Sequence, residues 1–307
     1  MAYEDKAAME LFLFGAGASY GSTAAGGPPM GSELFQALRQ FNPTGWGQLP
    51  DDLASLFRGD FERGMARLAE TNSHAMPILQ RAMAAFFFNF VPTTSSLYVR
   101  LAQRVQDHHW RGALATLNYE RLLELSLLHV GIQPVVGQAA GVGQVELSLP
   151  HGCCHLFCEG VRASSVGVSF SGVGVTFDGP AVAISDPQEF QRRINGDAVP
   201  PIMSYFEPQK TTSAGASFIQ NQRDRWAKLT SQADTIAIVG VKVRPRDSHI
   251  WLPMANSGAR VVYCAGSPAG DEFRTWAATS RRGKADRVLG GYFAEEFDSL
   301  CSEMGLC

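Results

Sequence analysis

The apolar residues of this chain gather in short runs, most of which end near glycine or proline, and segments with helical spacing separate them. The clearest runs are LFLF at 11–14, ALATL at 113–117 and TIAIVG at 235–240, and VELSL at 145–149 and ARVVYC at 259–264 add two more. Runs too short for a helix that stop at glycine are typical of buried strands in a parallel sheet. Their alternation with helical segments predicts an α/β fold with a Rossmann-like, doubly wound parallel sheet.

Two segments interrupt this alternation. Residues 42–110 contain three stretches of helical spacing separated by Pro, Ser and Thr, and they predict a helical subdomain inserted between strands. The aromatic run FFFNF at 86–90 lies within this insertion and is expected in the core. Residues 160–184 alternate Val or Phe with Gly or Ser, a pattern that favours a β-hairpin excursion. The last third returns to strands and helices, and its tail after residue 270 reads as mostly helical.

Composition and charge exclude several classes of protein. With 307 residues and 45% hydrophobic content, the chain has ample material for one large domain or two modest ones. A net charge of −3 without a dense Lys/Arg run argues against direct nucleic-acid binding. No apolar stretch approaches the roughly 20 residues that span a bilayer, and MAYEDKAAME lacks the layout of a signal peptide. We therefore expect a cytoplasmic protein.

The first strand runs into a turn, GAGASYG at 15–21, that consists almost entirely of small residues. In open α/β sheets, ligands bind at the carboxyl ends of the strands, and glycines there let backbone N–H groups approach a pyrophosphate. The spacing is G-x-G-x-x-x-G, which differs from the dinucleotide-binding pattern G-x-G-x-x-G. The turn alone therefore leaves phosphate binding and an ordinary tight turn as equal alternatives.

The six cysteines form no pair of C-x-x-C knuckles, and in a reducing cytosol most of them are expected as free thiols. The stretch HGCCHLFC brings His151, Cys154, His155 and Cys158 close together in sequence, so a metal site has to be considered. Their spacing fits no common zinc pattern, and we expect no metal.

Several motifs together resemble the sirtuin-like proteins of prokaryotes. They occur in the order of that family and span most of the chain: GAGAS at 15–19, TLNYE at 116–120, LPHG at 149–152, PPIMSYFEP at 200–208, IVG at 238–240 and RPRDSHIW at 244–251. The resemblance implies that residues 1–307 form a single sirtuin-like domain. It also implies that the chain binds NAD and breaks the bond between nicotinamide and ribose.

The resemblance assigns cofactor-binding positions. The turn would wrap the phosphates of NAD and continue into a loop over the reacting ribose, while the ends of two later strands would hold the adenosine side. The implied residues are Gly15, Ala16, Gly17, Ser19, Tyr20, Asn118, Gly240, Val241 and Gly266.

Asn118 and His151 are the candidate catalytic residues. Asn118 follows an expected strand, where its amide can hydrogen-bond a ribose hydroxyl or a water. The residues alone favour a helix N-cap at this position, and the resemblance reverses that preference. His151 is the histidine in the strand-HG context of the family, and a neutral imidazole can accept a proton from a ribose hydroxyl or from water. A structural histidine is the alternative. His155 and His249 are weaker candidates.

The resemblance leaves the roles of three acidic residues open. Glu120 stands where the family more often has Asp, and Glu207 lacks the preceding glycine of the family segment. Asp247 lies in the RPRDSHIW loop and can equally serve as a helix cap.

Two departures from the family narrow the activity. The segment that follows LPHG lacks the second cysteine pair of the deacylase zinc module, and PPMGSELF at 28–35 replaces the family's D-F-R segment. These departures favour an NAD glycohydrolase of the bacterial antiphage type, with nicotinamide and ADP-ribose or its cyclic form as products. A non-catalytic sensor or scaffold that binds NAD or ADP-ribose is the alternative, and an NAD-dependent deacylase is a third. Because the sirtuin-like domain accounts for the whole chain, we expect control by homo-oligomer formation or by a separately encoded regulatory partner.

Overall fold

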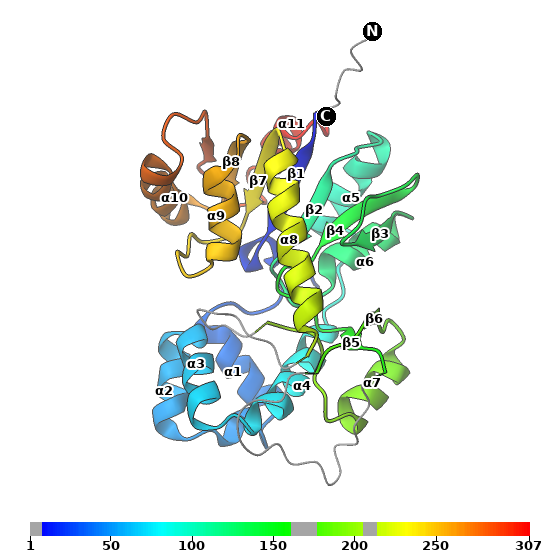
Figure 1. Cartoon of the computed structure of the whole chain (residues 1–307), viewed down its shortest axis with the longest axis vertical. Coiled ribbons are helices and arrows are strands. Elements are labelled where there is room, and N and C mark those ends of the chain that lie inside the picture. Colours follow the sequence, from blue (N-terminus) through cyan, green and yellow to red (C-terminus); the bar gives the residue numbers. More distant parts are fainter. Residues whose placement is uncertain (1–7, 161–176, 205–213) are drawn as a thin grey trace.

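The computed structural model describes residues 8–160, 177–204 and 214–307, and a parallel sheet forms the middle of its upper lobe in Figure 1. Its strands are β1 (Glu10–Phe14), β2 (Ala113–Thr116), β3 (Gln133–Val136), β4 (Gln144–Ser148), β7 (Thr235–Val239), β8 (Arg260–Cys264) and β9 (Arg287–Leu289). They lie in the order β3-β4-β2-β1-β7-β8-β9, and every neighbouring pair is parallel. The expected Rossmann-like α/β sheet is confirmed.

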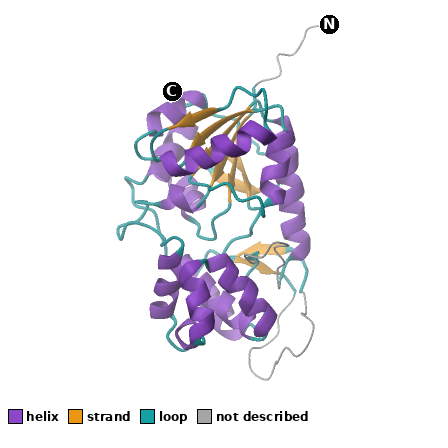
Figure 2. Cartoon of the chain, turned by 90° about the vertical axis from the view of Figure 1, so that its left-hand side faces the viewer, coloured by secondary structure: helices purple, strands orange, loops and turns teal. Residues whose placement is uncertain are grey.

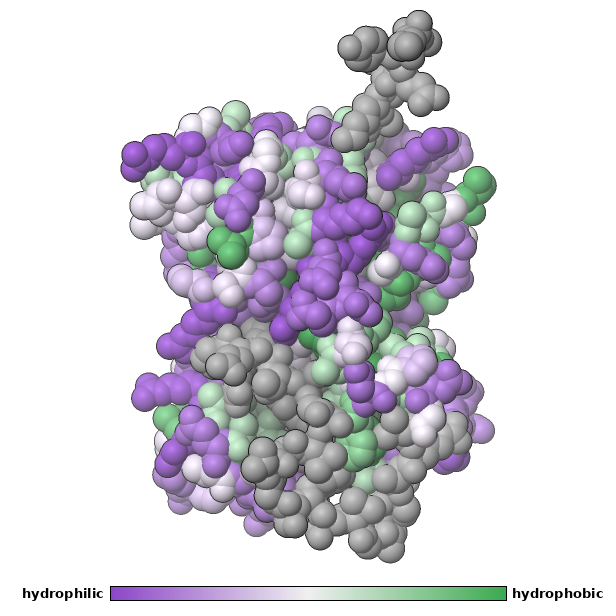
Figure 3. Space-filling view, viewed as in Figure 1, coloured by the Kyte–Doolittle hydropathy of each residue, from purple (hydrophilic) through white to green (hydrophobic). Residues whose placement is uncertain are grey.

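Helices cover both faces of this sheet. One face carries α8 (Ala216–Gln232), α9 (Ser248–Asn256) and α10 (Ser267–Ser280), and the other carries α5 (Leu97–Asp107), α6 (Leu122–His129) and α11 (Phe297–Glu303). Side chains of β1 alternate between them: Leu11 and Leu13 pack toward the first group, Phe12 and Phe14 toward the second. Both sets are fully buried, which explains the continuous apolar run. The face of α8 that is turned to solvent is hydrophilic (Figure 3).

A second, mainly helical lobe lies below the sheet in Figure 1, and α8 reaches from the sheet toward it. Its elements are α1 (Ser32–Phe41), α2 (Asp51–Gly59), α3 (Phe61–Thr71), α4 (Ala75–Phe88), α7 (Pro187–Gly196) and the antiparallel pair β5 (Leu156–Cys158) and β6 (Ala181–Ala183). Figure 2 shows the two lobes connected by loops. Trp46 is fully buried in this lobe and packs against Phe35 and Phe57. Within residues 42–110, α5 differs from α2–α4 because it packs beside the sheet against α6.

Two strands of the parallel sheet were not anticipated, and neither was the short strand β5 outside it. The tail after residue 270 was expected to be mostly helical, but Arg287–Leu289 forms the edge strand β9 beside β8. It contains three residues and begins with an exposed arginine, so hydrophobic periodicity gives no signal for it. The short strand β3 (Gln133–Val136) at the other edge was not predicted either, because it has only four residues and begins with an exposed glutamine. Of the β-rich excursion expected at 160–184, residues 161–176 lie outside the described residues, and β6 falls in the remainder.

The strand order reverses between β1 and β7, and this switch point determines where a site can form. The last residues of both strands are level, with Phe14 opposite Val239, and Phe14 is also opposite Thr116 of β2. The turns that follow these strands therefore meet at one edge of the sheet, the place where open α/β sheets bind ligands. No helix in the described parts of the chain is long and apolar enough to cross a membrane.

Candidate functional site

The glycine turn after β1 packs directly against the turn after β7. The backbone N–H of Gly17 donates to Gly240 O at 3.1 Å. A Cβ at Gly15 would lie 2.7 Å from both Gly240 O and Val241 Cγ2. Gly240 has φ +65°, and a Cβ there would lie 2.2 Å from the backbone nitrogen of Ala18. The bareness of the turn is therefore required for this backbone contact, which holds the switch point together.

Asn118 lies in a buried polar cluster beside this turn. Its Nδ2 is 3.1 Å from Gly15 O, 3.0 Å from Ser19 Oγ and 3.1 Å from Glu120 Oε1. Ser19 Oγ donates to Glu120 Oε1 at 2.5 Å and lies 3.2 Å from the hydroxyl of Tyr98. All four side chains are buried. Asn118 does not cap α6, which begins four residues later at Leu122. We call Ser19, Tyr98, Asn118 and Glu120 the serine–glutamate cluster.

Burial dominates the electrostatics of the serine–glutamate cluster. It raises the pKa of Glu120 from 4.5 to about 7, although hydrogen bonds from Ser19 and Asn118 act in the opposite direction. Burial and the nearby charge of Glu120 raise the pKa of Tyr98 well above its usual value. Glu120 therefore exchanges a proton near neutral pH. Its Oε1 accepts from both Ser19 and Asn118, and a proton on the other carboxyl oxygen would leave these two hydrogen bonds in place.

His151 follows β4, which is the neighbour of β2, so it lies at the same sheet edge as Asn118. Gly152 next to it has φ +76°, and a Cβ there would lie 2.0 Å from Ile202 O. The backbone N–H of Ser204 donates to His151 O at 2.9 Å, so the segment 202–204 holds this turn in place.

The ring of His151 faces a second histidine. Its Nε2 lies 3.0 Å from Nε2 of His249, and the ring centroids are 5.2 Å apart. His249 stands in the first turn of α9, in the loop-helix segment that follows β7. His151 is buried and His249 is half-buried. At this contact one Nε2 must carry a hydrogen and the other must accept it, so the two rings share one proton position.

Of the remaining predicted positions, four lie at the turn contact, and Tyr20 and Gly266 do not. Gly240 and Val241 meet the glycine turn as described, and Ala16 and Ser19 are the first and last residues of the short 3-10 helix η1 (Ala16–Ser19). Tyr20 is turned to solvent and not into the turn contact, since 75% of its surface is exposed. Gly266 has φ +77° at the end of β8, two strands from β1, and a Cβ there would meet the ring of Tyr292 at 2.4 Å.

Sequence reasoning missed two hydroxyl groups directly after the turn. Ser22 Oγ and Thr23 Oγ1 are buried and have no hydrogen-bond partner within the described residues. The loop that carries them is anchored, because the backbone N–H of Thr93 donates to Ser22 O at 3.0 Å. Buried hydroxyls without a partner are costly, and a bound polar ligand would satisfy them. The sequence signal that could have identified them is the pair of hydroxyl residues, Ser22 and Thr23, directly after Gly21.

The cysteine-rich segment forms its own buried arrangement. Cys153 Sγ donates to Tyr119 O at 3.1 Å and lies 3.2 Å from Nδ1 of His155, while Nε2 of His155 lies 3.3 Å from Glu124 Oε2. Burial lowers the pKa of His155, but Cys153 and Glu124 outweigh it and raise this pKa to about 10. Donor atoms of Cys153, Cys154 and His155 lie within 4.8 Å of one another, whereas His151 and Cys158 are not part of this group.

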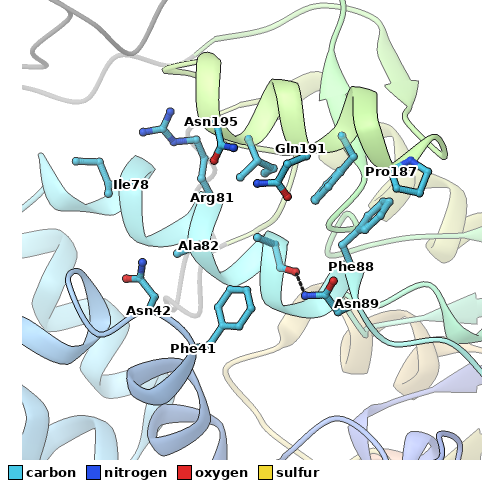
Figure 4. Close-up of a pocket in the computed structure, with 13 residues that line it drawn as sticks. Phe41, Asn42, Ile78, Arg81, Ala82, Phe88, Asn89, Pro187, Gln191 and Asn195 are labelled. Carbon is cyan, nitrogen blue, oxygen red and sulfur yellow. Dashed lines mark hydrogen bonds between the residues drawn. The ribbon is translucent and has the colours of Figure 1, made fainter.

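A groove in the helical lobe lies away from these residues. It opens between α4 and α7 in the helical lobe and is lined by aromatic and amide side chains, among them Phe41, Asn89 and Gln191 (Figure 4). None of the residues predicted for the site lines it.

No known family profile matches the chain, and no curated protein matches it. Solved structures do. A Sir2 homologue in complex with NAD is 15% identical, with 97% of this chain and 91% of that chain covered and a TM-score of 0.53. A mutant Sir2 homologue in complex with ADP-ribose is also 15% identical, with 96% and 92% covered and a TM-score of 0.50. The chain has a Sir2-like fold. The resemblance drawn from the sequence motifs is thereby confirmed at the level of the fold, and the Sir2-like sheet carries the glycine turn, Asn118 and His151 at one edge.

Proposed function

We propose that the protein is an NAD glycohydrolase that converts NAD and water to nicotinamide and ADP-ribose. One observation carries the proposal: the glycine turn, Asn118 and His151 follow the strands β1, β2 and β4, which are neighbours in the sheet, so all three lie at the same edge of it. The similarity of the fold to a Sir2 homologue in complex with NAD supports the choice of substrate.

The residues at the switch point suit NAD chemically. The buried hydroxyls of Ser22 and Thr23 lack partners within the described residues, and phosphate or ribose oxygens would satisfy them. The turn 15–19 would hold the phosphates, and Gly240, Val241 and Gly266 would lie on the adenosine side. Asn118 and His151 would then face the ribose that carries nicotinamide.

Cleavage of the nicotinamide–ribose bond leaves positive charge on the ribose carbon, so the site must orient the ribose and guide one water. The contacts of Asn118 Nδ2 with Gly15 O and Ser19 Oγ fix the plane of its amide. A fixed amide can hold a ribose hydroxyl or the attacking water in one orientation. His151 accepts the proton of that water as the new bond forms.

Release of free nicotinamide tests this function. Purified protein is incubated with NAD, alone and with an acetylated peptide, and nicotinamide is measured over time. We expect release without peptide, and equal release with it. Release that requires the peptide would identify a deacylase instead.

A non-catalytic NAD or ADP-ribose sensor is the second candidate. The observation that favours it is the extent to which Asn118 is already engaged, since its amide nitrogen lies within 3.1 Å of three oxygen atoms of the protein. A sensor would bind NAD or ADP-ribose in calorimetry and release no nicotinamide over hours, which separates it from the hydrolase.

We further propose that the hydrolase acts in the bacterial cytoplasm as an antiphage effector that depletes NAD. Such an activity needs control, and we assign it to assembly of the chain with itself or with a separately encoded partner. Expression in bacteria challenged with phage, with cellular NAD as the readout, tests this role independently of the chemistry.

A further inference from the structure

We propose that His249 carries the proton released at His151 to the solvent, so that the two histidines form one proton relay. The inference rests on the proposed function, and it assigns His249 a role that acts through His151 rather than on the substrate.

The balance of the reaction requires such a route. The oxygen of water forms a bond to the ribose carbon, and the electron pair of the broken carbon–nitrogen bond goes to the nicotinamide ring. That electron pair neutralises the pyridinium charge, so nicotinamide leaves as a neutral molecule. The water oxygen loses one proton, and one proton is therefore released in each turnover.

His151 is poorly placed to release this proton alone. It is buried, and an imidazolium that cannot reach water is costly to keep charged. Its Nε2 lies 3.0 Å from Nε2 of His249, a distance typical of a hydrogen bond. Imidazole can accept a proton at one nitrogen and give one up at the other, which suits it to pass a proton along.

His249 has the exposure that the next step needs. It is half-buried in the first turn of α9, whereas His151 is buried. His151 takes the proton of water at one ring nitrogen and gives the proton on Nε2 to His249, which then loses a proton to solvent. Both rings end neutral, and their original tautomers return when the emptied site readmits water.

Variants of His249 separate a relay from a structural contact. His249→Gln keeps a hydrogen-bonding amide that cannot carry a proton, and His249→Ala leaves space for added imidazole. His129→Gln is the matched control, because His129 is an exposed histidine at the end of α6. Rapid-quench measurement of nicotinamide resolves the first turnover from later ones.

We expect both His249 variants to release about one nicotinamide per chain at the wild-type rate and then to turn over roughly 100-fold more slowly, within the range of general acid–base effects. Added imidazole should restore turnover to His249→Ala and leave His249→Gln slow. Wild-type turnover in His249→Gln, or no effect of imidazole on His249→Ala, would overturn the relay while leaving the hydrolase intact. A wild-type protein that releases no nicotinamide would instead overturn the function, and the relay with it.

Discussion

Ser19 Oγ donates a hydrogen bond of 2.5 Å to Glu120 Oε1 in the interior of the protein. This contact joins the glycine turn after β1 to the segment after β2, which are 101 residues apart in sequence. Asn118 Nδ2 reaches both partners as well as Gly15 O, so this pair helps to hold the candidate catalytic amide in position. Glu120 therefore affects both the stability of the fold and the geometry of the site.

The first prediction concerns stability against pH. Burial raises the pKa of Glu120 from 4.5 to about 7, so the folded state binds this proton more tightly than the unfolded state does. The stabilising contribution is complete below about pH 4.5 and is lost as pH rises through about 7. We expect the free energy of unfolding of the wild type, relative to Glu120→Gln, to fall by about 3 kcal/mol between pH 4.5 and pH 8. Urea unfolding at several pH values measures it; parallel profiles would contradict the prediction.

The second prediction tests the two catalytic candidates. Asn118→Ala and His151→Ala should each lower nicotinamide release by about 10²-fold or more, because each removes a group that orients or deprotonates the water. Asn89→Ala is the control, since Asn89 is an exposed amide at the end of α4. Thermal unfolding establishes that each variant is folded. A folded variant with near-parental release would remove that residue from the site.

The third prediction separates backbone strain from close packing in the turn contact. Gly240 and Gly283 both have positive φ, +65° and +82°, but a Cβ at Gly283 would meet nothing within 4 Å. Gly283→Ala should cost about 1–2 kcal/mol from backbone strain alone. Gly240→Ala adds a clash with the backbone at Ala18 and should cost at least about 2 kcal/mol more. Equal losses in chemical denaturation would show that the two turns can move apart.

The sequence predicts the centre of the fold well because each central strand is buried on both faces. β1 and β7 contain apolar runs that stop at Gly15 and Gly240, and four of the five residues in each strand are buried. Edge strands such as Arg287–Leu289 are short and half-exposed, so their formation depends on pairing with a neighbour rather than on local composition.

The candidate site shows the same limit. The positions of Asn118 and His151 at strand ends could be read from the order of motifs, since parallel strands bring their carboxyl ends to one edge. The side chains that Asn118 and His151 contact could not be predicted from the sequence. Glu120 and His249 lie 2 and 98 residues from the groups they contact, and only the folded chain shows that they face them. The orphaned hydroxyls after the turn likewise depend on burial, which sequence alone does not give.

The fourth prediction concerns metal content. Cys153 and His155 contact each other and are held by Tyr119 O and Glu124, so two of the three donors already have partners within the protein. We expect metal analysis of the purified protein to find far less than one zinc per chain. One tightly bound zinc per chain would contradict this expectation, and its loss in Cys154→Ser but not in Cys264→Ser would place it in this group.

The fifth prediction concerns control by assembly. The segment 20–31 connects the end of the glycine turn to α1, and near its two ends Tyr20 and Met30 expose 75% and 38% of their surfaces. Exposed aromatic and methionine side chains are characteristic of protein contacts, and a contact that orders such a loop can complete a site.

We expect low NAD hydrolysis per chain at nanomolar concentration and a rise of about tenfold or more as the chain self-associates or binds its partner. Tyr20→Ser should shift this rise to higher concentration, whereas Val142→Ser, which removes a fully exposed apolar residue elsewhere, should not. Activity and sedimentation measured over the same concentration series would show whether the two rise together; full-rate hydrolysis by a dilute monomer, unchanged by any partner, would place control outside the protein.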